Sequence, residues 1–250
     1  MRSTTVRRSA LAASAAALAL LVTACGGSSD DDGKGDEGKA KALTAAELEK
    51  AALAQADVKN GKVVPAPKTY DVSQDKVKAE QAQCQSLAFA QTGIPAGTPA
   101  ASVKRSWTEG VEKPSGDEIS KEDIDRAFDR DTVLITLASY EDGGAEAVLK
   151  DVKAAQGACA GGFAYAADGG KTRITKVAAD KAAPAGADEA VALSLTIAAE
   201  DGDTFPVKVA VTRKGSTVVT FTVVNLGAAT NGKDSPFPTE IADAQLAKLG

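Results

Sequence analysis

Apolar positions along this chain change their period, and the change predicts helices in the first part and strands in the second. Thr44 and Glu47 have the spacing of a capping box, and alanine and leucine recur behind them every three or four residues. The segments Asp75–Gln91 and Ala145–Cys159 hold the same period over a longer distance, and each contains a cysteine. This spacing puts the apolar residues of each segment on one side of a helix. The sequence therefore predicts three helices in these regions.

Alternation of apolar and polar residues dominates the later part of the chain. Residues 131–140 are apolar on both sides, which is typical of a central strand that is buried on both faces. Between residues 163 and 223, apolar residues alternate with polar or small ones, and turn signals such as Asp168-Gly169-Gly170 separate the runs. This pattern predicts a series of hairpins in an antiparallel meander, with one buried face and one wet face.

Three further segments complete the predicted fold. Residues 103–107 alternate like one more strand, residues 110–130 are polar and predict a long loop with a helical turn, and a short helix follows Pro238. Together, these elements predict an α+β domain at residues 43–250. It would contain an antiparallel sheet of about seven strands, with helices packed on one face.

The first 25 residues carry a different pattern. Arginines within the first eight positions precede a short apolar run, Ser9–Val22, and the small residue Ala24 stands directly before Cys25. This order resembles the bacterial lipobox, which implies cleavage after residue 24 and lipidation of Cys25. A plain secretory signal with an incidental cysteine is the alternative. The apolar run is too short for a permanent membrane-spanning helix, which needs roughly 20 residues.

Residues 26–42 show no apolar period, so nothing in them can be buried to offset the entropy lost on ordering. We therefore expect a signal peptide at 1–24, a lipidated cysteine with a disordered tether at 25–42, and a single extracytoplasmic domain at 43–250. The lipid would hold the protein on the outer face of the bacterial cytoplasmic membrane, because two or more acyl chains give stable anchoring.

Composition narrows the chemistry of the domain. Removing residues 1–24 would take away three arginines and no acids, leaving 26 basic and 34 acidic side chains, a formal charge of −8. Such a domain is repelled by phosphate backbones, so we expect no nucleic-acid partner. Histidine, the commonest general base and metal ligand, is absent from the chain. We predict a non-enzymatic protein with no cofactor, no metal site and no catalytic residue.

Cysteine parity predicts one disulfide. If Cys25 is lipidated, Cys84 and Cys159 remain, and an even pair in an oxidising compartment favours a bridge. The bridge would span 75 residues. Two buried free thiols are the alternative.

The order of these elements resembles the PknH-like extracellular (sensor) domain family of actinobacteria. The features that carry the resemblance are Cys84 in an early helix, the strand Thr132–Ser139, the helix Ala145–Cys159, Gly161-Gly162 and the Val/Thr-rich hairpins. The resemblance implies a twisted antiparallel sheet with a cleft for an extracellular ligand. We therefore expect a membrane-anchored, sensor-like or ligand-binding lipoprotein, with an unknown extracellular ligand or an envelope protein as its partner.

A lipid or glycolipid carrier of the cell envelope is the alternative function, and an enzyme is the third. A deep apolar cavity would favour the carrier. A shallow polar cleft would favour the sensor, and a buried pair of carboxylates in a cleft would favour the enzyme. Trp107 and Tyr140 could line a binding site, but single aromatic residues in strands more often pack in the core. Arg105 could bind an anion, although a solvated edge position fits it better. The sequence assigns no ligand-binding residue.

Overall fold

The structure, a computed structural model, describes residues 41–110, 120–199, 202–225, 227–228 and 234–250. Its α-helices are α1 (Ala45–Ala51), α2 (Gln85–Thr92), α3 (Lys121–Phe128), α4 (Gly144–Ala158) and α6 (Thr239–Ala247). Its strands are β1 (Lys62–Pro65), β2 (Val77–Ala79), β3 (Ala101–Thr108), β4 (Asp131–Ser139), β5 (Phe163–Ala167), β6 (Gly170–Ala179), β7 (Glu189–Ala198), β8 (Thr204–Lys214) and β9 (Thr217–Asn225).

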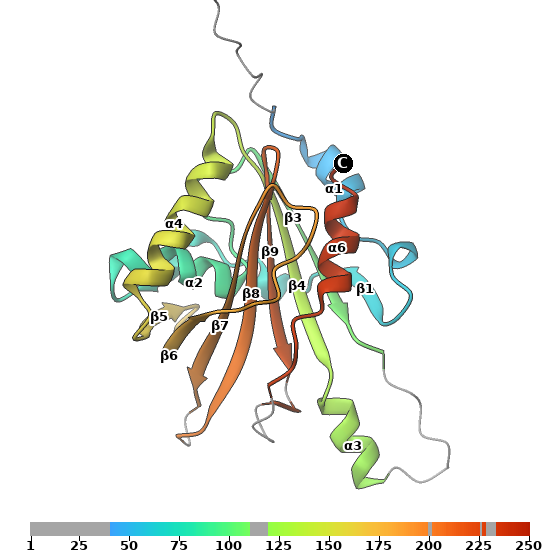
Figure 1. Cartoon of the computed structure of the whole chain (residues 1–250), viewed down its shortest axis with the longest axis vertical. Coiled ribbons are helices and arrows are strands. Elements are labelled where there is room, and N and C mark those ends of the chain that lie inside the picture. Colours follow the sequence, from blue (N-terminus) through green and yellow to red (C-terminus); the bar gives the residue numbers. More distant parts are fainter. Residues whose placement is uncertain (1–40, 111–119, 200–201, 226, 229–233) are drawn as a thin grey trace, which may run out of the picture. The chain divides into compact units, whose positions relative to one another are not determined.

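The nine described strands form one open sheet in the order β1-β3-β4-β9-β8-β7-β6-β5-β2. Every neighbouring pair runs antiparallel, and Figure 1 shows that the sheet is twisted. The predicted class, an α+β domain built on a twisted antiparallel sheet, is confirmed. The strand count exceeds the prediction of about seven because β1 and β2 have only four and three residues. Strands this short carry no readable period.

Helices cover both faces of the sheet, so the prediction of helices on one face is wrong. Helices α2 and α4 pack on one face, against side chains such as Leu193 and Val209. Helices α1 and α6 pack on the other, against side chains such as Ile135 and Phe221 (Figure 1). The central strands are apolar on both sides, and each apolar side must be covered to be shielded from water.

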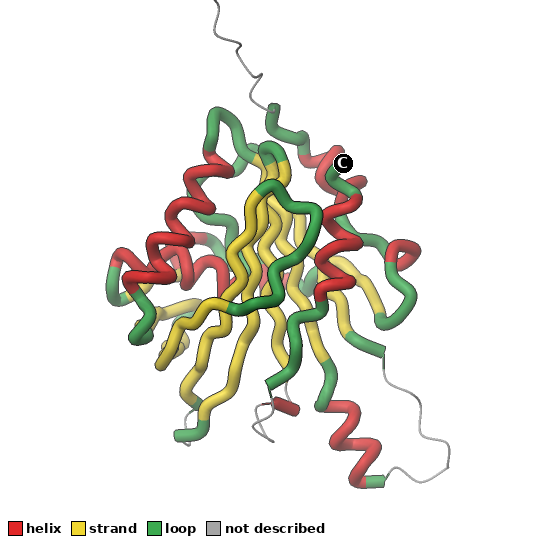
Figure 2. Tube along the Cα trace, viewed as in Figure 1, coloured by secondary structure: helices red, strands yellow, loops and turns green. Residues whose placement is uncertain are grey.

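Two segments differ locally from the predicted elements. Only the last part of the predicted helix at 75–91 is helical, because Val77 begins strand β2 and pairs with Ala167 of β5. The polar stretch 110–130 contains α3, which starts at a capping box formed by Ser120 and Asp123. In Figure 2 this helix stands apart from the sheet and from the helices on its two faces.

The predicted first helix is confirmed, and contacts with the domain begin just before it. Thr44 caps α1 with a capping box to Glu47. The Ser216 hydroxyl donates a hydrogen bond to the carbonyl of Lys41 at 2.9 Å, and Ala42 is buried. Cys25, the predicted signal peptide and residues 26–40 lie outside the described residues. Among the described residues, no helix combines the length and the apolar character needed to cross a membrane.

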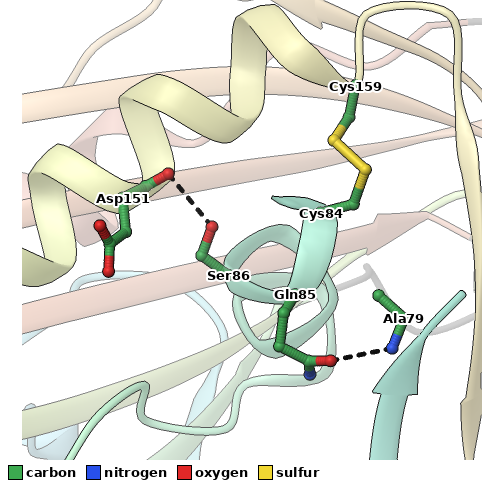
Figure 3. The surroundings of a disulfide bond; sticks show 6 residues. All are labelled: Ala79, Cys84, Gln85, Ser86, Asp151 and Cys159. Carbon is green, nitrogen blue, oxygen red and sulfur yellow. Dashed lines mark hydrogen bonds between the residues drawn. A yellow bond between two sulfur atoms is a disulfide. The ribbon is translucent and has the colours of Figure 1, made fainter. Parts of the chain in front are cut away.

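Cys84 and Cys159 form a disulfide, as their parity predicted, with Cα atoms 6.0 Å apart (Figure 3). Both residues are buried. Cys84 directly precedes α2, and Cys159 is the C-cap of α4. The bridge therefore ties the start of one helix to the end of the other.

Side-chain hydrogen bonds also fix the start of α2. The Ser86 hydroxyl donates to the carbonyl of Asp151 in α4 at 3.2 Å. The Gln85 side chain accepts from the Ala79 N–H at 2.9 Å (Figure 3). It also donates to the Val77 carbonyl at 2.9 Å. Helix α2 is thus attached to α4 on one side and to strand β2 on the other.

We predict that the double variant Cys84→Ala with Cys159→Ala folds but loses up to about 4 kcal/mol of unfolding free energy, the chain-entropy value for a loop of this length. Urea denaturation followed by circular dichroism measures the loss, and reduced wild type is the matched control. Thiol labelling of denatured, unreduced wild type should find neither cysteine free. Equal stability of the variant and the oxidised wild type would contradict the prediction.

Candidate functional site

A pocket of about 270 Å³ opens on the sheet face that carries α2, beside the end of this helix. We call it the β4–β9 pocket. Its lining consists of Thr69, Tyr70, Val72, Gln91, Thr92, Thr132, Leu134, Thr222 and Val224. The volume lies near the lower end of the ~300–1,000 Å³ range of small-molecule pockets.

Two central strands supply the floor of this pocket. Strands β4 and β9 pair so that Thr132 lies opposite Val224, and Leu134 lies opposite Thr222. Side chains alternate between the two faces along a strand, so these four point to the same face. The neighbouring Phe221 points to the other face, where it packs with the residues of α1 and α6.

The same sheet face changes from apolar to hydroxyl-rich across β9. On β7 and β8 this face presents Val191, Leu193, Leu195, Val207 and Val209, which α2 and α4 cover. On β3, β4 and β9 it presents Ser106, Thr108, Thr132, Thr136, Thr220 and Thr222. The pocket lies within this hydroxyl-rich part.

Some of these threonine hydroxyls cap α2. The Thr222 hydroxyl donates to the carbonyl of Ala90, and the Thr136 hydroxyl donates to the carbonyl of Gly93, each at 2.9 Å. The last carbonyls of a helix have no partner inside the helix, so the sheet supplies their hydrogen bonds. Both threonines therefore have a structural role before any ligand is considered, and of the two only Thr222 also lines the pocket.

Gly93 lets α2 end close to the floor. Its φ of +65° lies in the left-handed region, and a Cβ atom there would come within 2.3 Å of the Leu134 side chain. Glycine alone adopts this φ without strain and leaves room for the contact. The close approach positions Gln91 and Thr92 as one wall of the pocket.

The segment 67–74, which we call the strap, forms a second wall through Thr69, Tyr70 and Val72. The Lys104 ammonium donates a hydrogen bond to the carbonyl of Tyr70. The Gln74 amide donates to the carbonyls of Pro95 and Gly97, and both of these hydrogen bonds measure 2.7 Å. Burial lowers the pKa of Lys104, and the charge of Asp71 acts against this shift. The side chain of Tyr70 is 38% exposed, which places it at the rim.

Several polar groups of the lining are free to meet a ligand. The hydroxyls of Thr92 and Thr222 donate to carbonyls of α2, so their oxygens can only accept. The Gln91 carbonyl accepts from the Tyr165 hydroxyl, which leaves the Gln91 amide N–H groups available. Three hydroxyls have no hydrogen-bond partner within the described part of the chain: those of Thr69, Tyr70 and Thr132.

Apolar space beneath α2 and α4 is almost completely filled. The cavity there measures only about 10 Å³, and its walls include Phe89, Val148 and Val211. That volume holds about one water molecule. The deep apolar cavity that would favour a lipid carrier is therefore not found between these helices and the sheet.

Two other surface pockets are less suited to binding a ligand. One, of about 360 Å³, lies along β5 and β6, where Lys171 is already paired with Glu80 at 2.6 Å. The other, of about 370 Å³, lies beside α2 and α4, and five of its eleven lining residues are alanines. Among the residues that the structure describes, no three side chains of His, Cys, Asp or Glu are grouped to hold a metal ion.

The three residues that the sequence offered as possible binding residues, Trp107, Tyr140 and Arg105, do not line the β4–β9 pocket. Trp107 is buried on the opposite face and donates from its indole to a backbone carbonyl at 2.9 Å. Tyr140 is buried, and its hydroxyl donates to the Ala96 carbonyl at 2.8 Å. The Arg105 side chain is only 13% exposed and pairs with Glu49 of α1, so its expected solvated edge position is wrong.

One buried carboxylate bears on the enzyme alternative. Asp131 starts β4 and accepts from the Asn225 amide at 3.1 Å. Burial raises its pKa, the hydrogen bonds from Asn225 and Ser235 oppose the rise, and the charges of Glu109 and Asp129 add to it. Its side chain lies on the face opposite the β4–β9 pocket, because it alternates with Thr132 along the strand. None of the four pockets described above contains two carboxylates.

Sequence reasoning missed the residues of this pocket. Their signal was the placing of threonines an even number of positions apart on one sheet face, as in Thr132 and Thr136 or Thr220 and Thr222. That spacing indicates a hydroxyl-bearing sheet face, but it does not show which part of the face is open to a ligand.

No family model matches the sequence, and no curated protein matches it. The solved structures that are similar to the chain include two mycobacterial proteins. The extracellular domain of PknH from Mycobacterium tuberculosis has 12% identity and a TM-score of 0.46, over 84% of this chain and 95% of that one. An uncharacterised Mycobacterium smegmatis protein, the Rv0999 ortholog, has 15% identity and a TM-score of 0.32, over 76% of this chain and 87% of that one.

The resemblance to PknH-like extracellular domains that the sequence predicted is thus found among the structural neighbours, at low sequence identity. Neither likeness assigns a role to any residue of this chain.

We predict that Asp131→Asn raises the melting temperature at pH 7 by roughly 1–3 °C, the effect of a fraction of a kcal/mol in a domain of this size. The pKa of Asp131 is raised in the folded state, so the ionised form costs stability above that pKa. The gain in melting temperature should shrink as the pH falls through the pKa of Asp131, because the carboxyl of the wild type becomes protonated there.

Differential scanning calorimetry from pH 3.5 to pH 7 measures this effect. Asp151→Asn, at an exposed position of α4, is the matched control and should show no gain. A lower melting temperature for Asp131→Asn at pH 7 would show that the hydrogen bonds to the ionised carboxylate outweigh its burial.

Proposed function

We propose that this protein is a non-enzymatic, sensor-like domain that binds a small extracytoplasmic ligand in the β4–β9 pocket. The observation that carries the proposal is the set of free polar groups in the pocket, the hydroxyls of Thr69, Tyr70 and Thr132 and the Gln91 amide. Ligand sites typically combine an apolar surface with a few such convergent groups.

The position of the pocket supports binding by preorganised groups. Its floor lies on two central strands that are hydrogen-bonded on both sides, and one wall is the capped end of α2. Groups held on rigid elements lose little freedom when a ligand binds, which favours affinity. Among the described residues, every buried side-chain nitrogen or oxygen atom has a hydrogen-bond partner except the Nε of Arg213.

The alternative functions find less support. A lipid or glycolipid carrier needs a long apolar cavity, whereas six of the nine lining residues of this pocket carry a hydroxyl or an amide. An enzyme needs a positioned acid, base or nucleophile, and the lining contains no carboxylate, cysteine or lysine.

The domain is proposed to act on the outer face of the bacterial cytoplasmic membrane, held there by lipid on Cys25. The lipobox-like order before Cys25 supports this anchor, and the disulfide between Cys84 and Cys159 is compatible with an oxidising compartment. A formal charge of −8 on the chain after residue 24 disfavours direct binding to anionic headgroups, so the lipid would supply the attachment.

We predict that Thr132→Trp abolishes ligand retention, because the larger side chain fills the floor of the pocket. Native mass spectrometry of protein extracted from its own membrane should find a small-molecule adduct on the wild type and none on this variant. Thr204→Trp, at an exposed strand position outside the pocket, is the matched control and should keep the adduct. An adduct that persists in a folded Thr132→Trp protein, or wild type without any adduct, contradicts the proposed site.

We predict that Cys25→Ser moves the protein from the membrane fraction to the soluble fraction or blocks its processing. Intact-mass analysis of the wild type should show cleavage before Cys25 and added acyl chains. The double variant lacking Cys84 and Cys159 should remain in the membrane fraction, because it keeps the lipidated residue. A mature wild type with an unmodified cysteine would refute the lipid anchor.

A further inference from the structure

The electrostatics of the β4–β9 pocket disfavour a charged ligand. All nine lining residues are uncharged. The end of α2 that borders the pocket is its C-terminus, which carries the negative end of the helix dipole. Anions instead bind at helix N-termini or at Arg and Lys side chains. The Lys104 ammonium is engaged with the Tyr70 carbonyl, and its positive charge repels a cationic ligand.

The hydrogen-bonding groups call for a ligand that both donates and accepts. The oxygens of Thr92 and Thr222 only accept, because their hydrogens are donated to carbonyls of α2. The Gln91 amide N–H groups only donate, since the Gln91 carbonyl is occupied by Tyr165. A hydrocarbon would leave both kinds of group without a partner, at a cost in free energy. Ligand hydroxyls satisfy both kinds, because each hydroxyl donates one hydrogen and accepts others.

The remaining lining suits the carbon skeleton of such a ligand. Val72, Leu134 and Val224 provide apolar surface, and the Tyr70 ring stands at the rim. A sugar or cyclitol ring has C–H groups on its faces and hydroxyls around its edge, which matches a lining where apolar side chains lie among hydroxyl and amide groups. The volume of about 270 Å³ fits one small ring better than an acyl chain.

We infer that the ligand of the β4–β9 pocket is an uncharged polyhydroxylated ring, a neutral sugar or cyclitol. This inference rests on the proposed function, since it names the ligand class of the same site. The ring can be a free molecule or the terminal group of a glycolipid, because both present the same hydroxyls to the pocket.

The test compares matched ligands on the purified wild-type protein by isothermal titration calorimetry and saturation-transfer NMR. The neutral probes are D-glucose, D-galactose, D-mannose and myo-inositol. Glucuronate, glucosamine and cyclohexanol are the anionic, cationic and apolar counterparts. We expect at least one neutral probe to bind, and its charged and apolar counterparts to bind at least tenfold more weakly.

Conservative variants connect this binding to the pocket. Thr132→Val and Tyr70→Phe each remove one free hydroxyl with little change in shape, and each should weaken the binding of the neutral probe three- to tenfold. Thr204→Val, outside the pocket, should leave the affinity unchanged. Equal weakening in all three variants, or in none, overturns the assignment of these hydroxyls to the ligand.

A second arm distinguishes the two sources of the ring. The non-lipidated Cys25→Ser protein is mixed with phosphatidylcholine vesicles with or without digalactosyl diacylglycerol. Binding to the glycolipid vesicles that free galactose displaces indicates a glycolipid terminus, whereas binding of free sugar alone indicates a soluble ligand. Either result supports the neutral-ring inference.

Failure of the inference is distinguishable from failure of the proposed function. If a charged or apolar probe binds best, or if the native adduct lacks the composition of a neutral sugar or cyclitol, the ligand class is wrong. The site itself stands in that case, provided that Thr132→Trp loses the adduct. If no neutral probe binds and Thr132→Trp keeps the adduct, the ligand class and the binding site are both refuted.

Discussion

The last turn of α2 ends in carbonyl groups that the helix cannot satisfy, and the sheet satisfies them. The Thr222 hydroxyl donates to the Ala90 carbonyl, and the Thr136 hydroxyl donates to the Gly93 carbonyl. Because Gly93 has no Cβ, the helix end approaches β4 closely enough for these bonds to form. At its other end the helix is tied to α4 through the disulfide. A helix of eight residues is not stable alone, so these two attachments hold the wall of the pocket in place.

Threonine allows one strand to build both a core and a binding surface. Along β9, Val219, Phe221 and Val223 pack under α1 and α6, while Thr220 and Thr222 point to the pocket side. Threonine is β-branched and favours strands as valine does, but its hydroxyl can cap a helix or meet a ligand. The hydroxyl-rich part of the sheet therefore keeps its strand propensity, and the helices cover the parts where valine and leucine need shielding from water.

Local patterns predicted the elements whose residues interact mainly with their sequence neighbours. The capping box at Thr44 and the helical period of α4 are of this kind. Strand β4 pairs with distant strands, but its continuous apolar run still indicated a buried strand, and parity predicted the disulfide. Strand β2 escaped prediction because Val77 takes its conformation from pairing with Ala167, far away in the sequence. The pocket escaped for the same reason: the strap, the end of α2 and two central strands meet only in the folded chain.

The two walls of the pocket differ in how firmly they are held. The wall formed by α2 rests on buried hydrogen bonds and a disulfide. The strap is attached through the partly buried Val72 and through two polar side chains, Lys104 and Gln74, that donate to backbone carbonyls. Segments with few buried apolar contacts open at low free energy, while core strands open only with global unfolding. Of the pocket's parts, the strap is thus the one whose opening costs least. Since Lys104 donates to the carbonyl of Tyr70, this polar contact helps to hold the residue at the rim. The floor is the more firmly held part of the pocket, because its two strands are hydrogen-bonded to neighbouring strands on both sides.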